Sequence, residues 1–574
     1  MRAPAGWPRL VSWGVLLAAS ALFCWPLLTR ANMPWGMDMS FAAQMTEGML
    51  RGVGDGHLYP RWVDPMSRGL GAPAFVFYPP LTYWVTATFG GLTGDIVLGI
   101  RIVAIGGIVL SGLAFFLCAR PLTSEYGAAI GAALYILLPY HLIDMYDRFA
   151  FAELCAFVWT PLLLLFVRRV VERASVADAI GMALCYAGLA LTHLVTAYMM
   201  LLIVVPYGLW LTWRNGRWER IGWLAAAGAT GLLLAAIYLV PMLLEREHVN
   251  LQYITESYFG NWRRNFAFRD ETEFGFRPDA IKPAINSAVA WQAVLAAAAC
   301  AVAVFRCPAG SRERSDGLVF GALSAWVVFL QLPISTPVWT WLPELGTVQF
   351  PWRFGALQGL LAPLVVAVAL SEPKPAAAKP AAPARLDWRV AAAALVLVSA
   401  PGIYQGLTLW ELRKYVFNRD VAYDLGVQSK ALLEYTPKGA THWRETHRLP
   451  FTPPLRTGLE SKGDARVISW SSHERRVAYR SARPNRLWLA TFHHPGWRAH
   501  LEGSEGVEGA DELPLGPVPG SAFLIAEVPA GEHVVVFEFG STTPRRIGAA
   551  VSGLTLLGLL ALAGLHLRRR PRPV

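Results

Sequence analysis

Ionisable side chains lie beside the apolar segments of this 574-residue chain, where they could transfer protons or bind an anion. Asp38 follows the first apolar segment by a few residues and begins a long loop of polar and aromatic residues that also contains Asp64. A carboxylate at a membrane surface can act as a general base, because partial burial raises its pKa and a nearby cation tunes it. Aspartate in a loop also caps helices or forms turns, and the sequence alone leaves both interpretations open.

A second group of ionisable residues lies at the end of another apolar segment and comprises His141, Asp144, Asp147, Arg148 and Glu153. Spacings of three and four residues put the histidine, the first aspartate and the arginine on one face of a helix. Charges this dense at the end of a membrane span either line a site or form a solvated cap of ion pairs. Both alternatives stay open at this point.

Two further candidates stand at the ends of apolar segments. His193 occupies such an end, where a lone histidine is commonly an interfacial residue. Arg353 lies in the stretch Gln349-Phe-Pro-Trp-Arg-Phe354, in which Pro351 can start a helix and the aromatic residues suit a membrane interface. Its guanidinium could bind the phosphate of a lipid headgroup or anchor the helix by snorkelling.

The acidic residues also define a candidate metal site. If Asp38, Asp144 or Asp147, and Glu153 converge, their oxygen atoms could hold a divalent cation. The chain has no P-loop, HExxH, paired CxxC or GxSxG motif, so nucleotide hydrolysis, zinc proteolysis and serine hydrolysis lack support. Its six cysteines lie in or beside apolar segments without paired spacing, which argues against a disulfide framework.

Apolar helices must position these residues, because 54% of the chain is hydrophobic and only 16% is charged. This composition predicts a polytopic α-helical membrane protein. The net charge of +11 comes from short basic clusters between apolar segments, which indicate membrane topology and not nucleic-acid binding. About 12–13 transmembrane helices are expected, at roughly 9–29, 97–118, 126–141, 151–168, 176–193, 195–213, 221–243, 287–306, 317–333, 352–371, 388–408 and 547–567, with the short segment 81–94 at the interface or crossing as the thirteenth.

The basic clusters and a composition change near the C-terminus predict the domain organisation. Alternating apolar runs such as 466–470 and 533–539, separated by Gly, Pro and Asn, indicate a β-sandwich on the outer side. The predicted parts are a transmembrane domain at 1–371 with a long first outer loop at 31–80, a Pro/Ala-rich cytoplasmic linker at 372–387, a span at 388–408, the β-sandwich domain at 410–546, a final span at 547–567 and a basic cytoplasmic tail at 568–574.

Six stretches carry a resemblance to known proteins: Phe77-Tyr78-Pro79-Pro80-Leu81; Pro139-Tyr140-His141 with Arg148 and Glu153; Leu191-Thr192-His193; Gln349 to Phe354; Glu434-Tyr435-Thr436-Pro437; and His494-Pro495-Gly496-Trp497. With a span followed by a long loop that carries an early aspartate, they resemble the GT-C superfamily of polyprenyl-phosphate-sugar-dependent membrane glycosyltransferases. More narrowly, the chain resembles bacterial YfhO-type and 6-pyruvoyl-tetrahydropterin-synthase-related integral membrane proteins. The resemblance implies a GT-C-like fold in the bacterial cytoplasmic membrane, with the active site and the β domain on the outer side.

The resemblance also implies an activity. A sugar would pass from a polyprenyl-phosphate donor to an envelope glycan, lipid or protein, with Asp38 as the catalytic base and with Arg353 and Arg148 binding the donor phosphate. The residues expected to support catalysis or contact the acceptor are Asp64, His141, Asp144, Asp147, Glu153 and His193. No cofactor is required, a divalent cation is a candidate, and the expected partners are donor, acceptor and bilayer, without nucleic acid.

Two other functions remain as alternatives. A flippase or transporter of lipid-linked glycan would explain the many spans, but it predicts internal repeats and charges near mid-span, and neither is evident. A non-catalytic envelope assembly protein that retains the fold is the other alternative.

Overall fold

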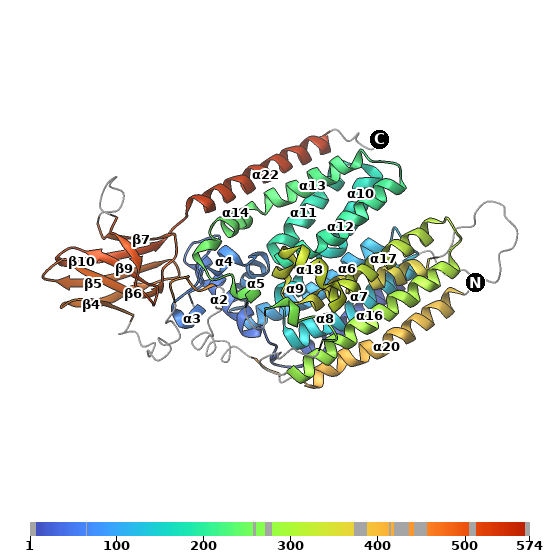
Figure 1. Ribbon diagram of the computed structural model, residues 1–574, viewed down its shortest axis with the longest axis horizontal. Coiled ribbons are helices and arrows are strands. Elements are labelled where there is room, and N and C mark those ends of the chain that lie inside the picture. Colours follow the sequence, from blue (N-terminus) through green and yellow to red (C-terminus); the bar gives the residue numbers. More distant parts are fainter. Residues whose placement is uncertain are drawn as a thin grey trace.

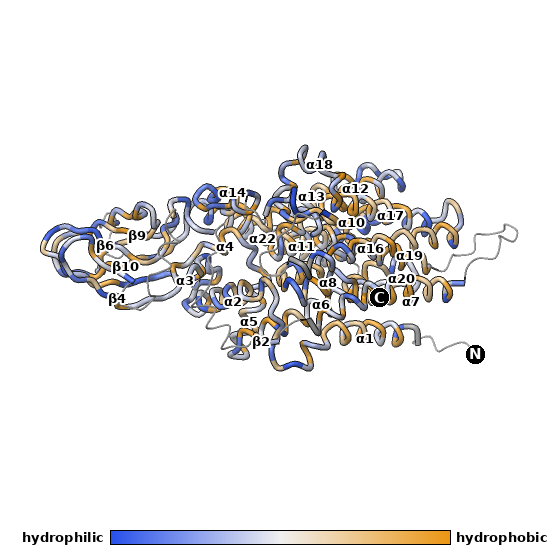
Figure 2. The backbone as a smooth tube through the Cα atoms, turned by 60° about the horizontal axis from the view of Figure 1, so that its bottom comes forward, coloured by the Kyte–Doolittle hydropathy of each residue, from blue (hydrophilic) through white to orange (hydrophobic). Residues whose placement is uncertain are grey.

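The computed structural model describes residues 7–64, 66–256, 260–269, 278–371, 387–412, 415–417, 435–440, 456–503 and 512–568. A helical region and a β domain lie at opposite ends of an elongated molecule (Figure 1). Apolar residues concentrate along the helices, whereas the β end alternates between polar and apolar residues (Figure 2). The predicted linker at 372–387, apart from its last residue, the tail after residue 568, and Glu434 lie outside the described residues.

The helical region is that of a multi-pass membrane protein. Within the described ranges, nine helices are long and apolar enough to cross a membrane, or up to 11 if each of two bent helix pairs is one span. The nine are α1 (Trp7–Thr29), α6 (Ile96–Ala119), α7 (Glu125–Leu137) continued to Arg148, α9 (Phe151–Ala156) continued by α10 (Trp159–Arg173), α12 (Leu194–Arg214), α16 (Pro278–Arg306), α19 (Gly355–Ala369) with the turn before it, α20 (Trp388–Leu412) and α22 (Thr543–Arg568).

The bent pairs and one short helix account for the remaining predicted spans. The pairs are α13 (Arg220–Leu234) with α14 (Ala236–Leu244), bent by 72°, and α17 (Arg312–Gln331) with the segment Pro333–Trp341 that contains α18 (Thr336–Trp341), bent by 88°. The segment predicted at 176–193 is α11 (Val176–Thr192), an apolar helix of 17 residues. The polytopic helical class is therefore confirmed, and the count of nine to 11 lies below the expected 12–13 because α11 is short and two segments bend.

The first loop, predicted at 31–80, folds into helices of its own. They are α2 (Met39–Gly54), α3 (Met66–Gly69) and α4 (Ala74–Phe77), followed by α5 (Leu81–Thr93). Met39, Met45 and Met49 lie on the buried side of α2, which explains why a segment this polar is helical. Because α5 has 13 residues and is therefore about 20 Å long, it is too short to cross the membrane alone.

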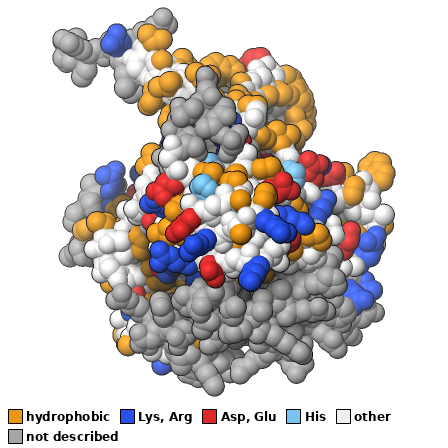
Figure 3. Space-filling view, turned by 90° about the vertical axis from the view of Figure 1, so that its left-hand side faces the viewer, with side chains coloured by type: hydrophobic (Ala, Val, Ile, Leu, Met, Phe, Trp, Pro, Cys, Tyr) orange, Lys and Arg blue, Asp and Glu red, His pale blue; other side chains and the backbone are white. Residues whose placement is uncertain are grey.

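The β domain is a sandwich of two antiparallel four-stranded sheets, as predicted. One sheet has the order β4 (Asp464–Trp470), β5 (Glu474–Ser481), β10 (Gly531–Phe539), β7 (Trp497–Leu501), and the other has the order β3 (Thr457–Leu459), β6 (Asn485–Phe492), β9 (Phe523–Val528), β8 (Leu515–Pro517). Inward-facing residues such as Leu487, Leu524 and Phe537 are fully buried between the sheets. On the described part of the face seen from this end, basic and acidic side chains are interspersed with apolar ones (Figure 3).

The first loop is built into the β domain. Trp62 is fully buried against Trp497 and Phe539, with ring centroids 5.2 and 5.0 Å apart. In addition, β1 (Met33–Pro34) pairs with β2 (Tyr415–Phe417), so the chain leaving α1 joins the chain leaving α20. The core of the β domain and the segment that follows α20 therefore both hold the first loop in place.

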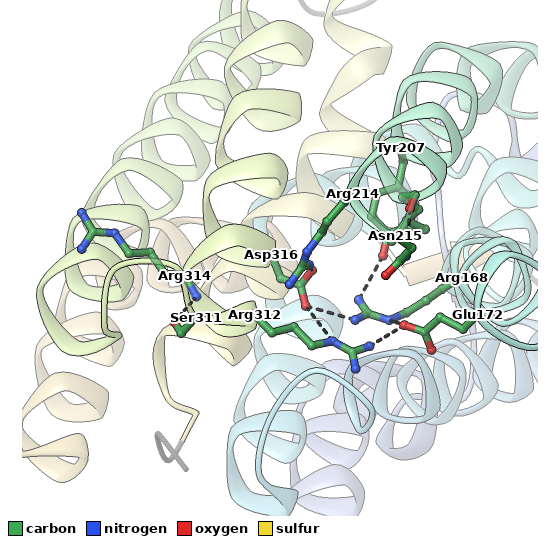
Figure 4. Close-up of polar contacts among 10 residues, drawn as sticks. Arg168, Glu172, Tyr207, Arg214, Asn215, Ser311, Arg312, Arg314 and Asp316 are labelled. Carbon is green, nitrogen blue, oxygen red and sulfur yellow. Dashed lines mark hydrogen bonds and ion pairs between the residues drawn. The ribbon is translucent and has the colours of Figure 1, made fainter. Parts of the chain in front are cut away.

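An arginine-rich cluster holds three helices together at the other end of the helical region (Figure 4). We define the Arg168 cluster as Arg168, Glu172, Tyr207, Arg214, Arg312 and Asp316. Arg168 donates to Glu172 (2.8 Å), Asp316 (3.1 Å) and the Tyr207 hydroxyl (3.3 Å). Arg214 and Arg312 also pair with Asp316, at 2.8 and 3.8 Å, and Arg312 pairs with Glu172. The cluster connects α10, α12 and α17.

Candidate functional site

The span that begins at Glu125 ends in one turn of π-helix, η1 (Asp144–Arg148). Phe149 follows with φ +53°, and α9 begins at Phe151, so the chain reverses within two residues. Turns of π-helix occur frequently at functional sites. This tight reversal brings Glu153 back to Arg148, although the two lie on consecutive spans.

Arg148 is the centre of a buried polar network, the Arg148 cluster, which comprises Tyr140, Asp144, Arg148 and Glu153. Its Nη1 donates to Glu153 Oε2 (3.1 Å) and to Tyr140 Oη (3.2 Å), and it forms an ion pair with Asp144. The Tyr140 hydroxyl donates to Glu153 Oε1 at 2.7 Å. The Trp352 ring covers the guanidinium, with 4.7 Å between Cζ and the ring centroid. These three acceptors share the two N–H groups of one nitrogen and restrict the position of the guanidinium.

The end of the π-turn anchors the start of the first loop. The Asp38 N–H donates to the Arg148 carbonyl (2.8 Å), and the Met37 N–H donates to the Asp147 carbonyl (3.2 Å). Carbonyls at the end of a helix have no intrahelical partner, which leaves them available to this loop. Gly36 allows the close approach, because a Cβ there would lie 2.4 Å from Phe149 Cβ.

Asp38 has the surroundings of a candidate proton acceptor. It precedes α2 at the N-cap position, yet its side chain makes no capping hydrogen bond with the described residues, so the cap interpretation is not supported. The side chain is accessible to solvent, but protein atoms surround it closely. This loss of water raises the pKa of Asp38, and the positive charges of Arg148 and Arg353 oppose the rise.

Arg353, whose positive charge acts on this carboxylate, lies in a short 3-10 turn, η6 (Pro351–Phe354), that leads into α19. Its Nη1 donates to the Val348 carbonyl (2.9 Å) and to Gln349 Oε1 (3.1 Å), and its Cζ lies 4.8 Å from the centroid of the Phe350 ring. The buried Nε atom has no hydrogen-bond partner among the described residues. Arg353 therefore retains donor capacity for an anion.

His193 lies between α11 and α12 and caps α12. Its Nδ1 is 2.7 Å from Thr196 Oγ1 and accepts the Thr196 N–H at 3.4 Å, so the neutral ring carries its proton on Nε2. Burial lowers the pKa of His193 to about 4, while the charge of Glu153 opposes this and those of Arg353 and Arg148 reinforce it. His193 is thus a neutral hydrogen-bond donor that lies within the electrostatic influence of Glu153, Arg353 and Arg148.

Three of the predicted site residues, Asp64, His141 and Asp147, have other surroundings. Asp64 pairs with Arg475 and accepts the Trp470 Nε1–H at 3.2 Å, so it belongs to the junction with the β domain. His141 is buried between aromatic rings, with centroids 4.0 Å from Phe157 and 4.6 Å from Tyr135, and neither ring nitrogen has a hydrogen-bond partner within the described ranges. Asp147 is buried in the π-turn and supplies the carbonyl that receives the Met37 N–H.

Three residues that sequence reasoning did not select belong to the site. Tyr140 bonds Glu153, Gln349 bonds Arg353, and Trp352 covers Arg148. All three occur in the stretches that carry the family resemblance, which was the available signal. Their residue types alone gave no indication of chemistry.

In the part of the chain that the structure describes, no group of three or more His, Cys, Asp or Glu side chains has the arrangement of a metal site. Asp144 and Glu153, two members of the proposed ligand set, are both paired with Arg148. Two of the four residues proposed as cation ligands therefore pair with a guanidinium.

Comparison with known proteins identifies relatives. A family model described as a 6-pyruvoyl-tetrahydropterin synthase related domain, membrane protein, matches residues 75–405. The chain is 26% identical over 267 residues to undecaprenyl phosphate-alpha-4-amino-4-deoxy-L-arabinose arabinosyl transferases of Pseudomonas paraeruginosa and Pseudomonas aeruginosa. The alignment covers 46% of this chain and 45% of each relative, so the chain spans less than half the length of these curated relatives.

The solved structures compared with this chain include membrane glycosyltransferases, with low overall similarity. Arabinofuranosyltransferase AftD from Mycobacteria has a TM-score of 0.45 and 15% identity over 93% of this chain and 42% of its own. ArnT from Cupriavidus metallidurans, bound to undecaprenyl phosphate, has a TM-score of 0.30 and 14% identity over 64% of this chain and 78% of its own. Because the family model covers more than half of the sequence, the chain belongs to the 6-pyruvoyl-tetrahydropterin synthase related family of membrane proteins.

Proposed function

We propose that this protein transfers a sugar from a polyprenyl-phosphate donor to a hydroxyl group of an envelope acceptor. The observation that carries the proposal is the pairing of Asp38, an exposed residue whose carboxylate has a raised pKa, with the charge of Arg353, a half-buried arginine whose buried Nε has no hydrogen-bond partner among the described residues. The names of the curated relatives specify an undecaprenyl-phosphate-linked sugar and a transferase, which supports this donor class.

The proposed reaction is a single displacement. The acceptor oxygen forms a bond to the anomeric carbon while Asp38 takes the hydroxyl proton. The bond between the anomeric carbon and the phosphate oxygen breaks, and its electron pair stays on that oxygen, so polyprenyl phosphate leaves with one additional negative charge. Arg353 stabilises this developing charge, and attack from the opposite side inverts the configuration at the anomeric carbon.

We assign a positioning role to Arg148, where the sequence suggested phosphate binding. Its Nη1 is occupied by two carboxylates and a tyrosine hydroxyl, and its carbonyl holds the Asp38 backbone. Glu153 and Tyr140 fix the arginine, and His193 supplies a neutral Nε2–H donor for the acceptor or the donor sugar. These residues would set the geometry in which the base and the phosphate site meet.

The test compares Asp38→Asn with Glu47→Gln in the full-length protein in proteoliposomes. Glu47 lies on α2, the helix that Asp38 precedes, and its ion pair among the described residues is with Arg51, so it is a matched control for the loss of one carboxylate. We expect Asp38→Asn to lower transfer from radiolabelled polyprenyl-phosphate sugars by about 10²–10⁴-fold, the usual contribution of a general base, and Glu47→Gln to leave it unchanged. Normal transfer by a folded Asp38→Asn protein would refute the base assignment, and glycolipid translocation without transfer would favour the flippase.

A further inference from the structure

Gln349 lies between a segment that follows α14 and the proposed phosphate-binding arginine. Its Oε1 accepts from Arg353 Nη1 at 3.1 Å, and its Nε2 donates to the carbonyl of Ile254 at 2.8 Å. Ile254 belongs to α15 (Tyr253–Glu256). The orientation of the amide group is determined by its partners, because only this orientation places an acceptor against the guanidinium and a donor against a carbonyl.

The backbone at Gln349 has a costly conformation. Its φ and ψ are +65° and −45°, and the Phe350 N–H bonds the Val348 carbonyl at 2.7 Å. These features define a γ-turn of the non-inverse type, which is rare and strained for a residue other than glycine. The same turn aims two acceptors, Val348 O and Gln349 Oε1, at one nitrogen of Arg353.

The segment contacted by Gln349 is itself tied to the chain that enters the β domain. Asn250 Nδ2 donates to Thr436 Oγ1 (3.1 Å) and to the Pro437 carbonyl (3.1 Å), and Val249 forms a β-bridge with Pro437. A continuous series of contacts therefore runs from 436–437 through 249–254 and Gln349 to Arg353.

We infer that Gln349 is a positioning residue that sets the Arg353 guanidinium for the donor phosphate and makes its placement depend on the docked segment 249–256. This inference rests on the proposed function, since it concerns the affinity of the same site for a polyprenyl phosphate. The strained turn holds Arg353 Nη1 in place, and the amide bridge transmits the position of the docked segment to it. A free Nε–H then faces the phosphate site without rearrangement of the guanidinium.

The experiment measures binding of undecaprenyl phosphate to the full-length protein in nanodiscs by native mass spectrometry. We compare the wild type with Gln349→Ala and Gln349→Gly, which both delete the bridge, while glycine accepts the positive φ without strain and covers the case in which alanine impairs folding. The expected result is a rise in Kd on the order of tenfold in both variants, the effect of losing one hydrogen bond to a charged group. In an Arg353→Ala protein the same substitutions should have no further effect.

A second readout separates positioning from a general loss of structure. Hydrogen exchange at 250–256 should become faster in both Gln349 variants, while exchange in the β strands stays unchanged. Wild-type affinity in a folded Gln349→Gly protein, or full additivity with Arg353→Ala, would overturn the inference and leave the proposed function intact. Failure of the wild type itself to bind undecaprenyl phosphate would overturn the proposed function and the inference with it.

Discussion

Two buried arginines at opposite ends of the helical region have the same kinds of partner. Each contacts two carboxylates and a tyrosine hydroxyl: Asp144, Glu153 and Tyr140 for Arg148, and Glu172, Asp316 and Tyr207 for Arg168. The partners of Arg148 all lie within eight residues of it in sequence, whereas Asp316 lies 148 residues from Arg168. The first arginine therefore shapes one tight turn, and the second joins separate helices.

The two clusters also differ in charge. The Arg148 cluster has one cation for two carboxylates, and its additional positive charge comes from Arg353 beside Asp38. The Arg168 cluster has three cations, Arg168, Arg214 and Arg312, for two carboxylates, and Asp316 binds all three of them. The same chemistry thus shapes a site at one end and fastens helices together at the other.

Removal of each central arginine gives the largest expected effects. Arg148→Met and Arg168→Met should each lower the free energy of unfolding by about 3–5 kcal/mol, because each leaves buried carboxylates without their cation. At a temperature where both variants are folded, only Arg148→Met should also abolish sugar transfer, because Arg148 is the one of the two arginines whose charge acts on Asp38. Denaturation in detergent measures the change in stability, and transfer assays measure the change in activity. Loss of transfer in folded Arg168→Met would show that the Arg168 cluster is also needed for the reaction.

Gly36→Ala tests the contact between the loop and the π-turn. The added Cβ would lie 2.4 Å from Phe149 Cβ, so we expect a destabilisation of about 1–3 kcal/mol. Displacement of Asp38 by about 1 Å should lower transfer by roughly 10²-fold. Gly54→Ala, at the end of α2 with nothing within 4 Å, is the matched control and should be neutral. Equal behaviour of the two variants would contradict the proposed anchoring.

Asp316→Asn should affect stability without affecting activity. The amide keeps the shape of the side chain but loses charge-assisted contacts with three arginines, which we expect to cost about 1–3 kcal/mol. Transfer by the folded protein should equal that of the wild type. A reduced kcat in this variant would indicate that the Arg168 cluster takes part in the reaction.

The pH dependence of transfer gives the smallest and most specific effect. Asp38 must be deprotonated to accept a proton, and burial raises its pKa. On acidification, activity should therefore begin to fall at a pH above the pKa of an ordinary aspartate. Arg353→Gln removes a charge that lowers this pKa, so the acid limb of the kcat/KM profile should move to higher pH in the residual activity. Arg214→Gln, in the other cluster, should leave the profile where it is.

The sequence predicted features that depend on local patterns. Alternation of apolar residues at 466–470 and 533–539 identified β4 and β10, but the short strands β3, β7 and β8 carry too few residues for a clear pattern. The helix α2 lies in the stretch predicted as a loop, because only one of its sides is apolar. The π-turn at Asp144–Arg148 and the positive φ of Gln349 depend on tertiary contacts and have no local signal.

The sequence predicted which residues belong to the candidate site better than it predicted which residues contact one another. Charges at span ends identified Arg148, Glu153 and Arg353 as candidates, and the structure places their charges around Asp38. Asp64 was grouped with Asp38 because both occur in one loop, yet its partner Arg475 lies 411 residues away in sequence. Such pairing follows from the docking of the β domain, which a pattern in the first loop cannot reveal.

The burial of Trp62 has a consequence for the order of assembly. This side chain from the first loop completes the core of a domain whose strands β3 to β10 follow the helices α5 to α20 in the chain. The Trp62 side chain therefore stays exposed until residues 456–540 have been synthesised and lie on the same side of the membrane. Closing so distant a contact is slow for entropic reasons. The Asp38 region thus reaches its final packing only after the β domain has been made, and removal of residues 456–540 would leave the first loop without its packing partner.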